Sequence, residues 1–326
     1  MKLLRKKDIT SAARLALMRT LLPTSHRLEN TVILTGLPRS GTTWLGEIVN
    51  TIPRSAMLFE PLHLRRVPEA KSAGFSWATL LESEAEHPEA LEFIERILRG
   101  QFINEWIARD LKIKDCLGMK VLIVKFVRAQ RILEWMVSNF PIRRPLYIIR
   151  HPCAVVASQV RLEWKTRIDH SAVMGEPVLR LFPHLTGFVE ELETIEERLA
   201  AKWCLGNYYA LSRSKPYNFE LVTYEQLVTD GPAQLERIFT ALGFPVPEQA
   251  ISNFKSPSVT THFGDPWSSG NPINNWTKIL DKEQIKRILD VVESFGMNFY
   301  TEDLEPDYNR LYGDTSPILS TSGTTP

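Results

Sequence analysis

The sequence has few cysteines, no long apolar run and almost no net charge, and each absence excludes a class of protein. Three cysteines in 326 residues, with no CxxC pair, argue against a disulfide framework and a cysteine zinc site. No stretch approaches the ~20 apolar residues that span a bilayer. A net charge of +1 gives no general attraction to nucleic acid, so an anionic ligand needs a local site. Cys116, Cys153 and Cys204 are predicted to be small buried residues of a protein from a reducing compartment.

The N-terminal stretch is basic but lacks the pattern of a signal peptide. Residues 1–20 carry six Lys or Arg side chains and a single acid, Asp8. Arg14 and Arg19 interrupt the apolar residues, and no small-residue cleavage site follows. We therefore expect residues 1–25 to form a basic helix on the surface of a cytoplasmic protein. Weak contact of this helix with a membrane surface stays an alternative.

Short apolar runs alternate with helical patterns along the chain. The runs that predict buried strands lie at 31–36, 121–126, 146–149 and 219–224. Helical patterns follow at 42–52, 188–213 and 281–295, the last with Asp281 as N-cap and Gly296 at its end. This alternation predicts a three-layer α/β fold, with a P-loop-NTPase-like parallel sheet flanked by helices.

The chain shows no internal repeat and no linker that divides it. We expect a single domain over residues 26–312, in which the weakly periodic segments 65–118 and 161–187 are insertions over the sheet edge. Residues 313–326 are polar and are predicted to form a disordered tail.

A glycine-containing loop joins the first predicted strand to the first predicted helix, where residues 36–44 read GLPRSGTTW. Backbone N–H groups at such a junction, the positive end of the helix dipole and nearby hydroxyls form a cradle for phosphate. The ATP-binding loop GxxxxGK[ST] has lysine where this chain has Thr42, and the cation here is Arg39. The loop is therefore predicted to bind a shorter phosphate chain than that of ATP. The alternative is a Gly/Ser turn with a helix cap.

A second anion site is predicted where the strand 146–149 ends. Arg150 follows this strand directly, and Ser158 lies about two helical turns further on. Ligands bind at this edge of open parallel sheets, and a guanidinium fork with a hydroxyl suits a phosphate. An arginine at a strand end is also a common surface charge, so this pattern is weak by itself.

Together the two sites resemble those of sulfotransferases that use 3′-phosphoadenosine-5′-phosphosulfate (PAPS). That family has a 5′-phosphosulfate loop of the form P-[KR]-S-G-[TS]-[TS], matched by residues 38–43. Its 3′-phosphate motif, a strand-end Arg with a Ser eight residues later, is matched by Arg150 and Ser158. Two features, the arginine in the loop and the Glu60-Pro61 pair, resemble those of the carbohydrate and tyrosylprotein branches of the family. The chain also resembles bacterial soluble members. The resemblance implies sulfuryl transfer from PAPS to a hydroxyl or amine, with PAP as the product.

The resemblance also implies a role for each matched residue. Arg39 is expected to stabilise the donor and the transition state. The residues expected to hold the nucleotide are Arg39, Ser40, Gly41, Thr42, Thr43, Trp44, Arg150 and Ser158. Trp44 either stacks on adenine or belongs to the core of the first helix.

The acceptor needs a general base, and the Glu of the Glu-Pro pair has that role in the tyrosylprotein enzymes. Glu60 is therefore the candidate base, with a structural ion pair to Arg39 or Arg65 as the alternative and His63 in reserve. Lys125 and Arg128 either orient the sulfonate or an acidic acceptor, or form a solvated pair. The role of His151, which follows Arg150, stays open.

The acceptor is expected to be a small molecule or a glycan, with a carbohydrate or glycolipid head group favoured. Aromatic side chains of the two insertions either face such an acceptor or belong to the core: Trp77, Phe102, Trp106, Trp164, Phe182 and the neighbouring His184. No His or carboxylate cluster has metal-ligand spacing, so neither a metal nor a nucleic-acid partner is expected. Two other hypotheses stay open: a nucleotide or sugar kinase on the same loop fold, and a PAP-binding module without catalysis.

Overall fold

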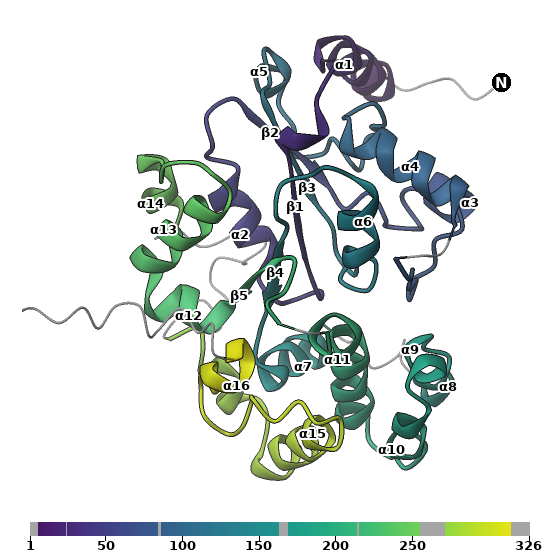
Figure 1. Ribbon diagram of the computed structural model, residues 1–326, viewed down its shortest axis with the longest axis vertical. Helices are drawn as coiled ribbons and strands as arrows, with labels where there is room; N and C mark the ends of the chain where they lie inside the picture. The colour runs from purple at the N-terminus through teal and green to yellow at the C-terminus, as the bar shows by residue number, and fades with distance from the viewer. Residues whose placement is uncertain are drawn as a thin grey trace, which may run out of the picture.

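In a computed structural model the described residues are 6–23, 25–83, 86–162, 169–213, 215–254 and 271–313, so the predicted tail from residue 314 onward lies outside them. Five parallel strands form one sheet in the order β2-β3-β1-β4-β5 (Figure 1). The strands are β1 (Thr31–Gly36), β2 (Ser55–Phe59), β3 (Val121–Lys125), β4 (Leu146–Ile149) and β5 (Glu220–Thr223). The predicted parallel sheet is confirmed.

The strand predictions are correct in four places and incomplete in one. β1 and β4 have the predicted bounds, and β3 and β5 are slightly shorter than predicted. β2 was missed because its sequence, SAMLF, contains no β-branched residue, which is the main signal of a buried strand. β2 pairs with β3 along its whole length and carries Glu60 at its end.

Side chains of the strands alternate between two cores, as expected for a sheet covered on both faces. In β1, Val32 and Leu34 belong to the smaller core, and Ile33 belongs to the larger one. The smaller core includes side chains of α2 (Thr42–Val49), α13 (Gly231–Ala241) and α14 (Glu248–Phe254). The larger core includes side chains of α4 (Pro88–Leu98), α6 (Leu133–Asn139), α7 (Pro152–Arg161), α11 (Ile195–Leu211) and α15 (Lys282–Ser294).

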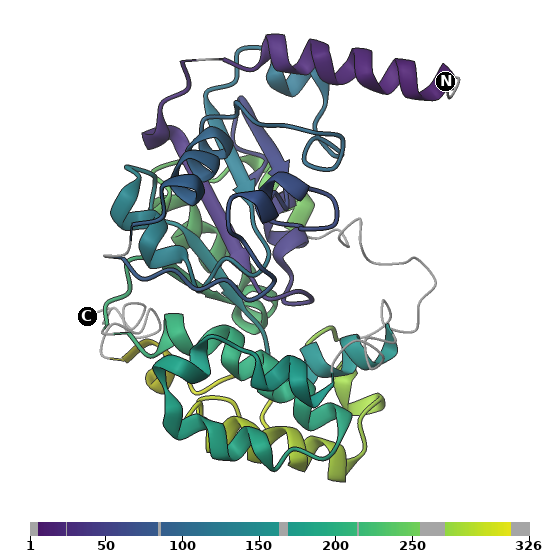
Figure 2. The ribbon, with the colours of Figure 1, turned by 90° about the vertical axis from the view of Figure 1, so that its right-hand side faces the viewer.

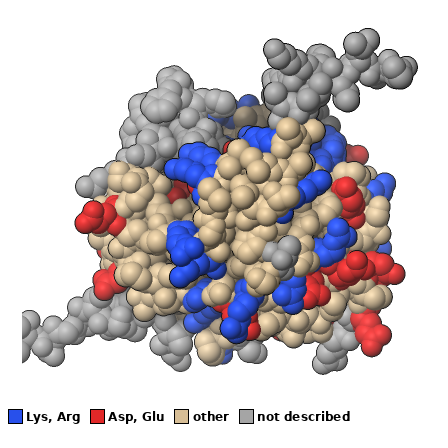
Figure 3. All heavy atoms as spheres, turned by 90° about the horizontal axis from the view of Figure 1, so that it is seen from above, with Lys and Arg blue, Asp and Glu red and all other residues tan. Residues whose placement is uncertain are grey.

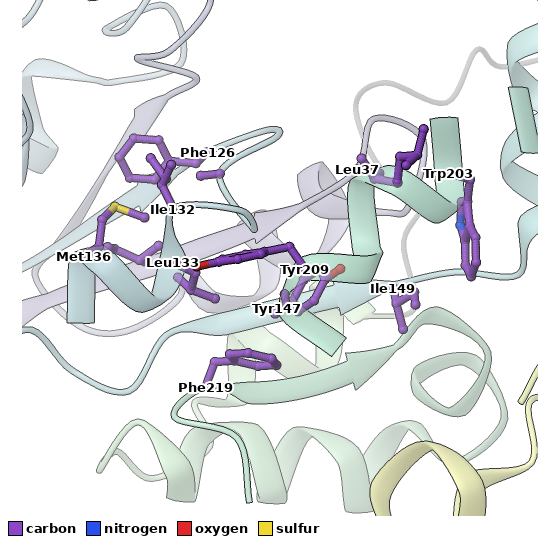
Figure 4. Packing of buried hydrophobic residues seen from close by; sticks show 14 of the residues in the cluster. Leu37, Phe126, Ile132, Leu133, Met136, Tyr147, Ile149, Trp203, Tyr209 and Phe219 are labelled. Carbon is purple, nitrogen blue, oxygen red and sulfur yellow. The ribbon is translucent and has the colours of Figure 1, made fainter. Parts of the chain in front are cut away.

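The larger core is densely aromatic where α11 crosses the sheet. Tyr147 of β4 and Phe219 pack edge to face with ring centroids 5.2 Å apart (Figure 4). The buried hydroxyl of Tyr147 donates to Asn207 of α11 at 2.5 Å, which satisfies its polar end. All three cysteines are free and buried, as predicted.

The segment 65–118 differs from its prediction as an insertion over the sheet edge. It contains α3 (Pro68–Ser72), α4 and α5 (Ile113–Cys116), and α4 lies against β3. Phe93, Ile94 and Ile97 of α4 are buried in the larger core. The reason is that α4 carries a continuous apolar stripe, so it covers a face of the sheet.

The predicted helix 188–213 is two helices, α10 (Thr186–Glu190) and α11. The Thr194 hydroxyl accepts the N–H of Glu197, and the Glu197 carboxylate accepts the N–H of Thr194, so a capping box starts α11 at Ile195. Phe188 is 41% exposed in consequence and does not extend the buried stripe of α11. The predicted N-cap of α15 is confirmed, since Asp281 accepts the N–H of Gln284 at 2.8 Å.

Short helices connect these elements. They are η1 (Leu28–Asn30), α8 (His170–Met174), α9 (Val178–Leu181), η3 (Pro183–Leu185), α12 (Tyr224–Thr229), η5 (Asn275–Lys278) and α16 (Tyr308–Tyr312).

The basic helix α1 (Lys6–Leu21) lies at the end of the molecule drawn uppermost in Figure 2. Arg19 donates to the carbonyl of Ile103 at 2.8 Å, and Arg14 donates to that of Ala108 at 3.2 Å. These two arginines attach α1 to the domain, so they are not simply solvated. On this side of the molecule Lys and Arg side chains surround a largely uncharged area (Figure 3). Within the described ranges, no helix has both the length and the apolar character to cross a bilayer.

Candidate active site

The predicted site residues gather at the edge of the sheet where the strands end. Arg39 follows β1, Glu60 follows β2, Arg128 follows β3 and Arg150 follows β4. The carboxyl ends of parallel strands meet at one edge, which is where such sheets bind ligands. Because β1 lies between β3 and β4, the loop after β1 is at the centre of this edge.

The loop between β1 and α2 has the form of an anion cradle. Gly41 is left-handed (φ 93°) and starts α2 without a side-chain cap, which leaves the first-turn N–H groups without a side-chain partner. A Cβ at Gly41 would lie 2.7 Å from the Tyr224 ring, and one at Gly36 would lie 2.5 Å from the Ile148 carbonyl oxygen, so both positions need glycine. The hydroxyl of Ser40 is buried and has no hydrogen-bond partner among the described residues. These features fit a bound 5′-phosphate.

Arg39 joins the two predicted phosphate sites. Its Nε donates to the Ser158 hydroxyl at 2.9 Å, although the two residues are 119 positions apart. Its carbonyl accepts from Nη1 of Arg150 at 3.3 Å. Burial, and then the nearby charge of Arg150, lowers the pKa of Arg39. The sequence presents two separate anion sites, and the fold places their residues in direct contact.

Arg150 is held in place from several sides. Its Nη2 donates to the Pro272 carbonyl at 3.0 Å, and its guanidinium lies over the Tyr224 ring at 3.9 Å. Its own carbonyl accepts from the Trp203 indole at 3.1 Å. Its buried Nε has no partner among the described residues. Arg150 is therefore oriented by the fold while one donor stays available for a phosphate.

His151 is a helix cap, which answers the question that the sequence left open. Its Nδ1 accepts the N–H of Cys153 at the start of α7, and its Nε2 donates to the Thr301 carbonyl at 3.0 Å. The ring stacks on Trp276 with centroids 4.7 Å apart. Burial lowers the pKa of His151 to about 4, so the ring is neutral at physiological pH.

A buried carboxyl that the sequence did not single out as a site residue supports this strand end. Oε1 of Glu225 accepts the N–H of His151 at 2.9 Å, and Oε2 accepts the Tyr300 hydroxyl at 2.9 Å. Burial raises the pKa of Glu225 to about 7.

Glu60 forms an ion pair, but with a different partner from those predicted. Its Oε1 lies 3.2 Å from Nζ of Lys125, and its N–H donates to the Lys125 carbonyl at 2.8 Å. The Lys125 side chain is 1% exposed and that of Glu60 is 20% exposed. Burial lowers the pKa of Lys125, and the charge of Glu60 opposes that shift. Of the two alternatives for Lys125, the solvated side chain is therefore wrong.

A cavity of about 590 Å³ opens beside the loop, where Leu37 and Pro38 form part of its wall. His63, Trp77, Arg128 and Trp203 also line it. Its size suits a small molecule.

Few of the insertion aromatics face this cavity. Trp77 lines it, whereas Phe102, Trp106 and Phe182 pack against the larger core. Trp164 lies outside the described residues. Trp44 stacks on Phe254 with centroids 5.5 Å apart and packs against the smaller core, so its contact with adenine stays a prediction. In the described part of the chain, no group of three or more His, Cys, Asp or Glu is placed to hold a metal ion.

The chain matches the model of the sulfotransferase family over residues 31–248 and belongs to this family. Solved structures similar to it include the sulfotransferase domain of the Synechococcus PCC 7002 olefin synthase, with 19% identity, a TM-score of 0.47 and coverage of 86% of this chain and 98% of that one. The mouse sulfotransferase SULT7A1 complexed with PAP has 13% identity and a TM-score of 0.45, with 85% and 88% covered. Sulfotransferase STF1 from Mycobacterium tuberculosis H37Rv has 13% identity and a TM-score of 0.44, with 89% and 82% covered. No curated protein matches the chain.

Proposed function

We propose that this protein transfers the sulfuryl group of PAPS to a hydroxyl or amine of a small-molecule or glycan acceptor. The observation that supports this best is the β1–α2 loop of a chain from the sulfotransferase family. There the Ser40 hydroxyl is buried without a partner among the described residues, and α2 starts without a side-chain cap. PAPS would supply an activated sulfonate on a phosphate leaving group.

In this proposal the loop holds the nucleotide's phosphates. Ser40 and the N–H groups of residues 41–43 bind the 5′-phosphate, and Arg39 supplies positive charge where negative charge develops. Arg150 and Ser158 bind the 3′-phosphate. The contact between Arg39 and Ser158 supports one continuous binding surface for both phosphates.

Glu60 is the proposed base. A bond forms between the acceptor oxygen and sulfur, the bond from sulfur to the bridging oxygen of the donor breaks, and the acceptor proton goes to Glu60. Lys125 binds Oε1 of Glu60, so we expect Oε2 to accept the proton. Lys125 thereby positions the carboxylate at the strand end.

The proposal extends to the protein's surroundings. We expect residues 26–312 to form the catalytic domain and the protein to be cytoplasmic, and weak contact of α1 with a membrane surface stays the alternative. Neither a nucleic-acid partner nor a metal is part of the proposed reaction.

The deciding experiment incubates the purified protein with PAPS and a panel of glycans, glycolipid head groups, phenols and amines. A mass gain of one SO₃ group on an acceptor, with equal formation of PAP, is the expected result. Binding of PAP without any transfer would instead favour the PAP-binding module.

A further inference from the structure

The cavity beside the β1–α2 loop has an excess of positive charge. Its charged lining residues are Arg65, Arg128, Arg131, Lys202 and Glu176. With four cations and one carboxylate, the cavity favours an anionic occupant.

Two of these cations are already paired with the one carboxylate of the lining. Glu176 is buried and forms ion pairs with Arg131, at 2.7 Å, and with Lys202. Arg131 also donates to the Leu205 carbonyl, and Lys202 donates to that of Ala172. These contacts make the three side chains part of the cavity wall.

Arg128 differs from these two cations. It is partly buried, and no carboxylate of the described residues lies within 4.0 Å of its guanidinium, which lies over the Trp77 ring at 5.1 Å. Glu60 and Glu176 are near enough to act on its charge but do not pair with it. Partial burial of a guanidinium without an anion is unfavourable, and a carboxylate offers it two parallel hydrogen bonds.

The backbone fixes Arg128 relative to the loop. Its φ of 69° lies in the left-handed region, and its N–H donates to the Gly36 carbonyl at 3.2 Å. Arg39 and Glu60 also have positive φ values, of 76° and 41°. Unfavourable backbone geometry that gathers at one edge of a sheet is typical of a functional site.

We propose that the acceptor carries a carboxylate in addition to the group that receives the sulfonate, that Arg128 binds this carboxylate, and that Trp77 packs against the acceptor's ring. This inference rests on the proposed function, because it names the acceptor of that reaction. Hydroxylated aromatic acids and acidic sugars have the required chemistry and a size that suits the cavity.

The test compares matched acceptors that differ in one charge. The pairs are 4-hydroxyphenylacetate with 4-hydroxyphenylacetamide, and 4-nitrophenyl β-glucuronide with 4-nitrophenyl β-glucoside. We expect kcat/KM for sulfation to favour at least one acid by roughly ten- to a hundredfold, which corresponds to about 1.4–2.8 kcal/mol. Arg128→Gln should remove that preference. Arg66→Gln, at an exposed arginine outside the cavity lining, should keep it.

Two further measurements distinguish the loss of the carboxylate contact from misfolding of the variant and from a failure of the proposed function. The affinity of Arg128→Gln for PAP should stay near that of the wild type, which excludes misfolding. Calorimetry of each acid and its neutral partner on PAP-loaded protein compares them without turnover, so it applies even if no transfer occurs and the proposed function fails. Equal affinities for the acids and their partners, or equal losses of turnover for both in Arg128→Gln, would overturn the inference. Equal losses would assign Arg128 to the transferred sulfonate.

Discussion

At the scale of single residues, the charged side chains of the site have partners that come from other elements of the fold. Glu60 contacts Lys125 where β2 and β3 end, and Arg39, in the loop after β1, contacts Ser158 of α7. A buried charge is stable only when paired or hydrogen-bonded, so these contacts also keep the side chains of Glu60 and Arg39 in place. Substitutions that preserve shape and remove charge are therefore the most informative.

Glu60→Gln tests the proposed base. The amide keeps the size of the side chain and cannot take a proton, so we expect PAP affinity to be kept and turnover to fall by ~10²-fold or more. Calorimetry with PAP and the rate of PAP formation measure the two effects. Glu69→Gln, on exposed α3, serves as the control. Near-normal turnover would make Glu60 structural and direct the search to His63, whose buried Nδ1 has no partner among the described residues.

Arg150→Ala tests whether Arg150 binds the 3′-phosphate. Two charge-assisted hydrogen bonds of at least ~1.5 kcal/mol each give a preference of roughly a hundredfold for PAPS over adenosine 5′-phosphosulfate. The variant should lose most of this preference, Arg150→Lys should restore part of it, and Ser158→Ala should cost less.

The affinities of wild type and variant for both nucleotides form the measurement. Arg150 also binds the Pro272 and Arg39 carbonyls, so some loss for both ligands is expected. Only the difference between the two ligands reports on the 3′-phosphate. Equal losses for both would show that Arg150 supports the fold instead.

Glu225 and His151 touch, and their shifted pKa values affect stability in opposite directions. Burial raises the pKa of Glu225 from 4.5 to about 7, so between these values the native state holds a proton that the unfolded chain has lost, and stability falls as pH rises. Burial lowers the pKa of His151 from 6.5 to about 4, so between these values the unfolded chain binds the extra proton, and stability rises with pH. The two windows overlap between pH 4.5 and 6.5.

Glu225→Gln should reveal the rise of stability with pH that the lowered pKa of His151 causes. The amide still accepts the His151 N–H but does not titrate, so the free energy of unfolding of the variant should rise more steeply with pH between 4.5 and 6.5 than that of the wild type. Urea unfolding across this range measures it, with the exposed Glu248→Gln as control. Parallel profiles for the variant and wild type would contradict this explanation.

At the scale of elements, the backbone of the loop between β1 and α2 sets the direction in which α2 starts. Its left-handed Gly41 turns the chain so that α2 points its N-terminus at the sheet edge, and Tyr224 of α12 packs against that turn. A side chain at Gly41 would meet both the strained φ and the Tyr224 ring.

Gly41→Ala should therefore weaken PAP binding by about tenfold or more and destabilise the protein by roughly 1–2 kcal/mol from the backbone alone. Gly74→Ala is a matched control, because Gly74 has a similar φ of 87° and nothing within 4 Å of an added Cβ. It should lower the unfolding free energy only. Chemical unfolding and PAP calorimetry separate the two effects, and unchanged PAP affinity in Gly41→Ala would argue against the cradle.

At the scale of the whole molecule, the loop between β1 and α2 carries its cation at Arg39, whereas ATP-binding loops carry a lysine at the position of Thr42. The sheet places Arg150 and Lys125 on either side of that loop. Positive charge at the site thus comes from side chains at or after the ends of three neighbouring strands.

We expect PAP to bind with unchanged affinity after treatment with EDTA, and Mg·ATP to compete poorly. The reason is that protein cations take the place of a bridging metal ion, and Thr42 leaves no lysine for the β- and γ-phosphates. Calorimetry with and without EDTA, and competition with Mg·ATP, measure both. Strong, metal-dependent binding of ATP would favour the kinase hypothesis.

The sequence by itself determined the local features: four strands, the glycine-containing loop between β1 and α2, the strand-end Arg150 and the cap of α15. These depend on residues within one turn or one strand, so short patterns carry them. The family followed from two such motifs in the right order.

Only the tertiary structure decided which of these residues meet. The contact of Arg39 with Ser158, the pairing of Glu60 with Lys125 and the support of His151 by Glu225 all follow from the strand order β2-β3-β1-β4-β5. The chain order does not contain that arrangement, because strands that are neighbours in the sheet are joined through long connections. The same holds for Arg128 and its cavity, whose walls come from segments that are far apart in the chain.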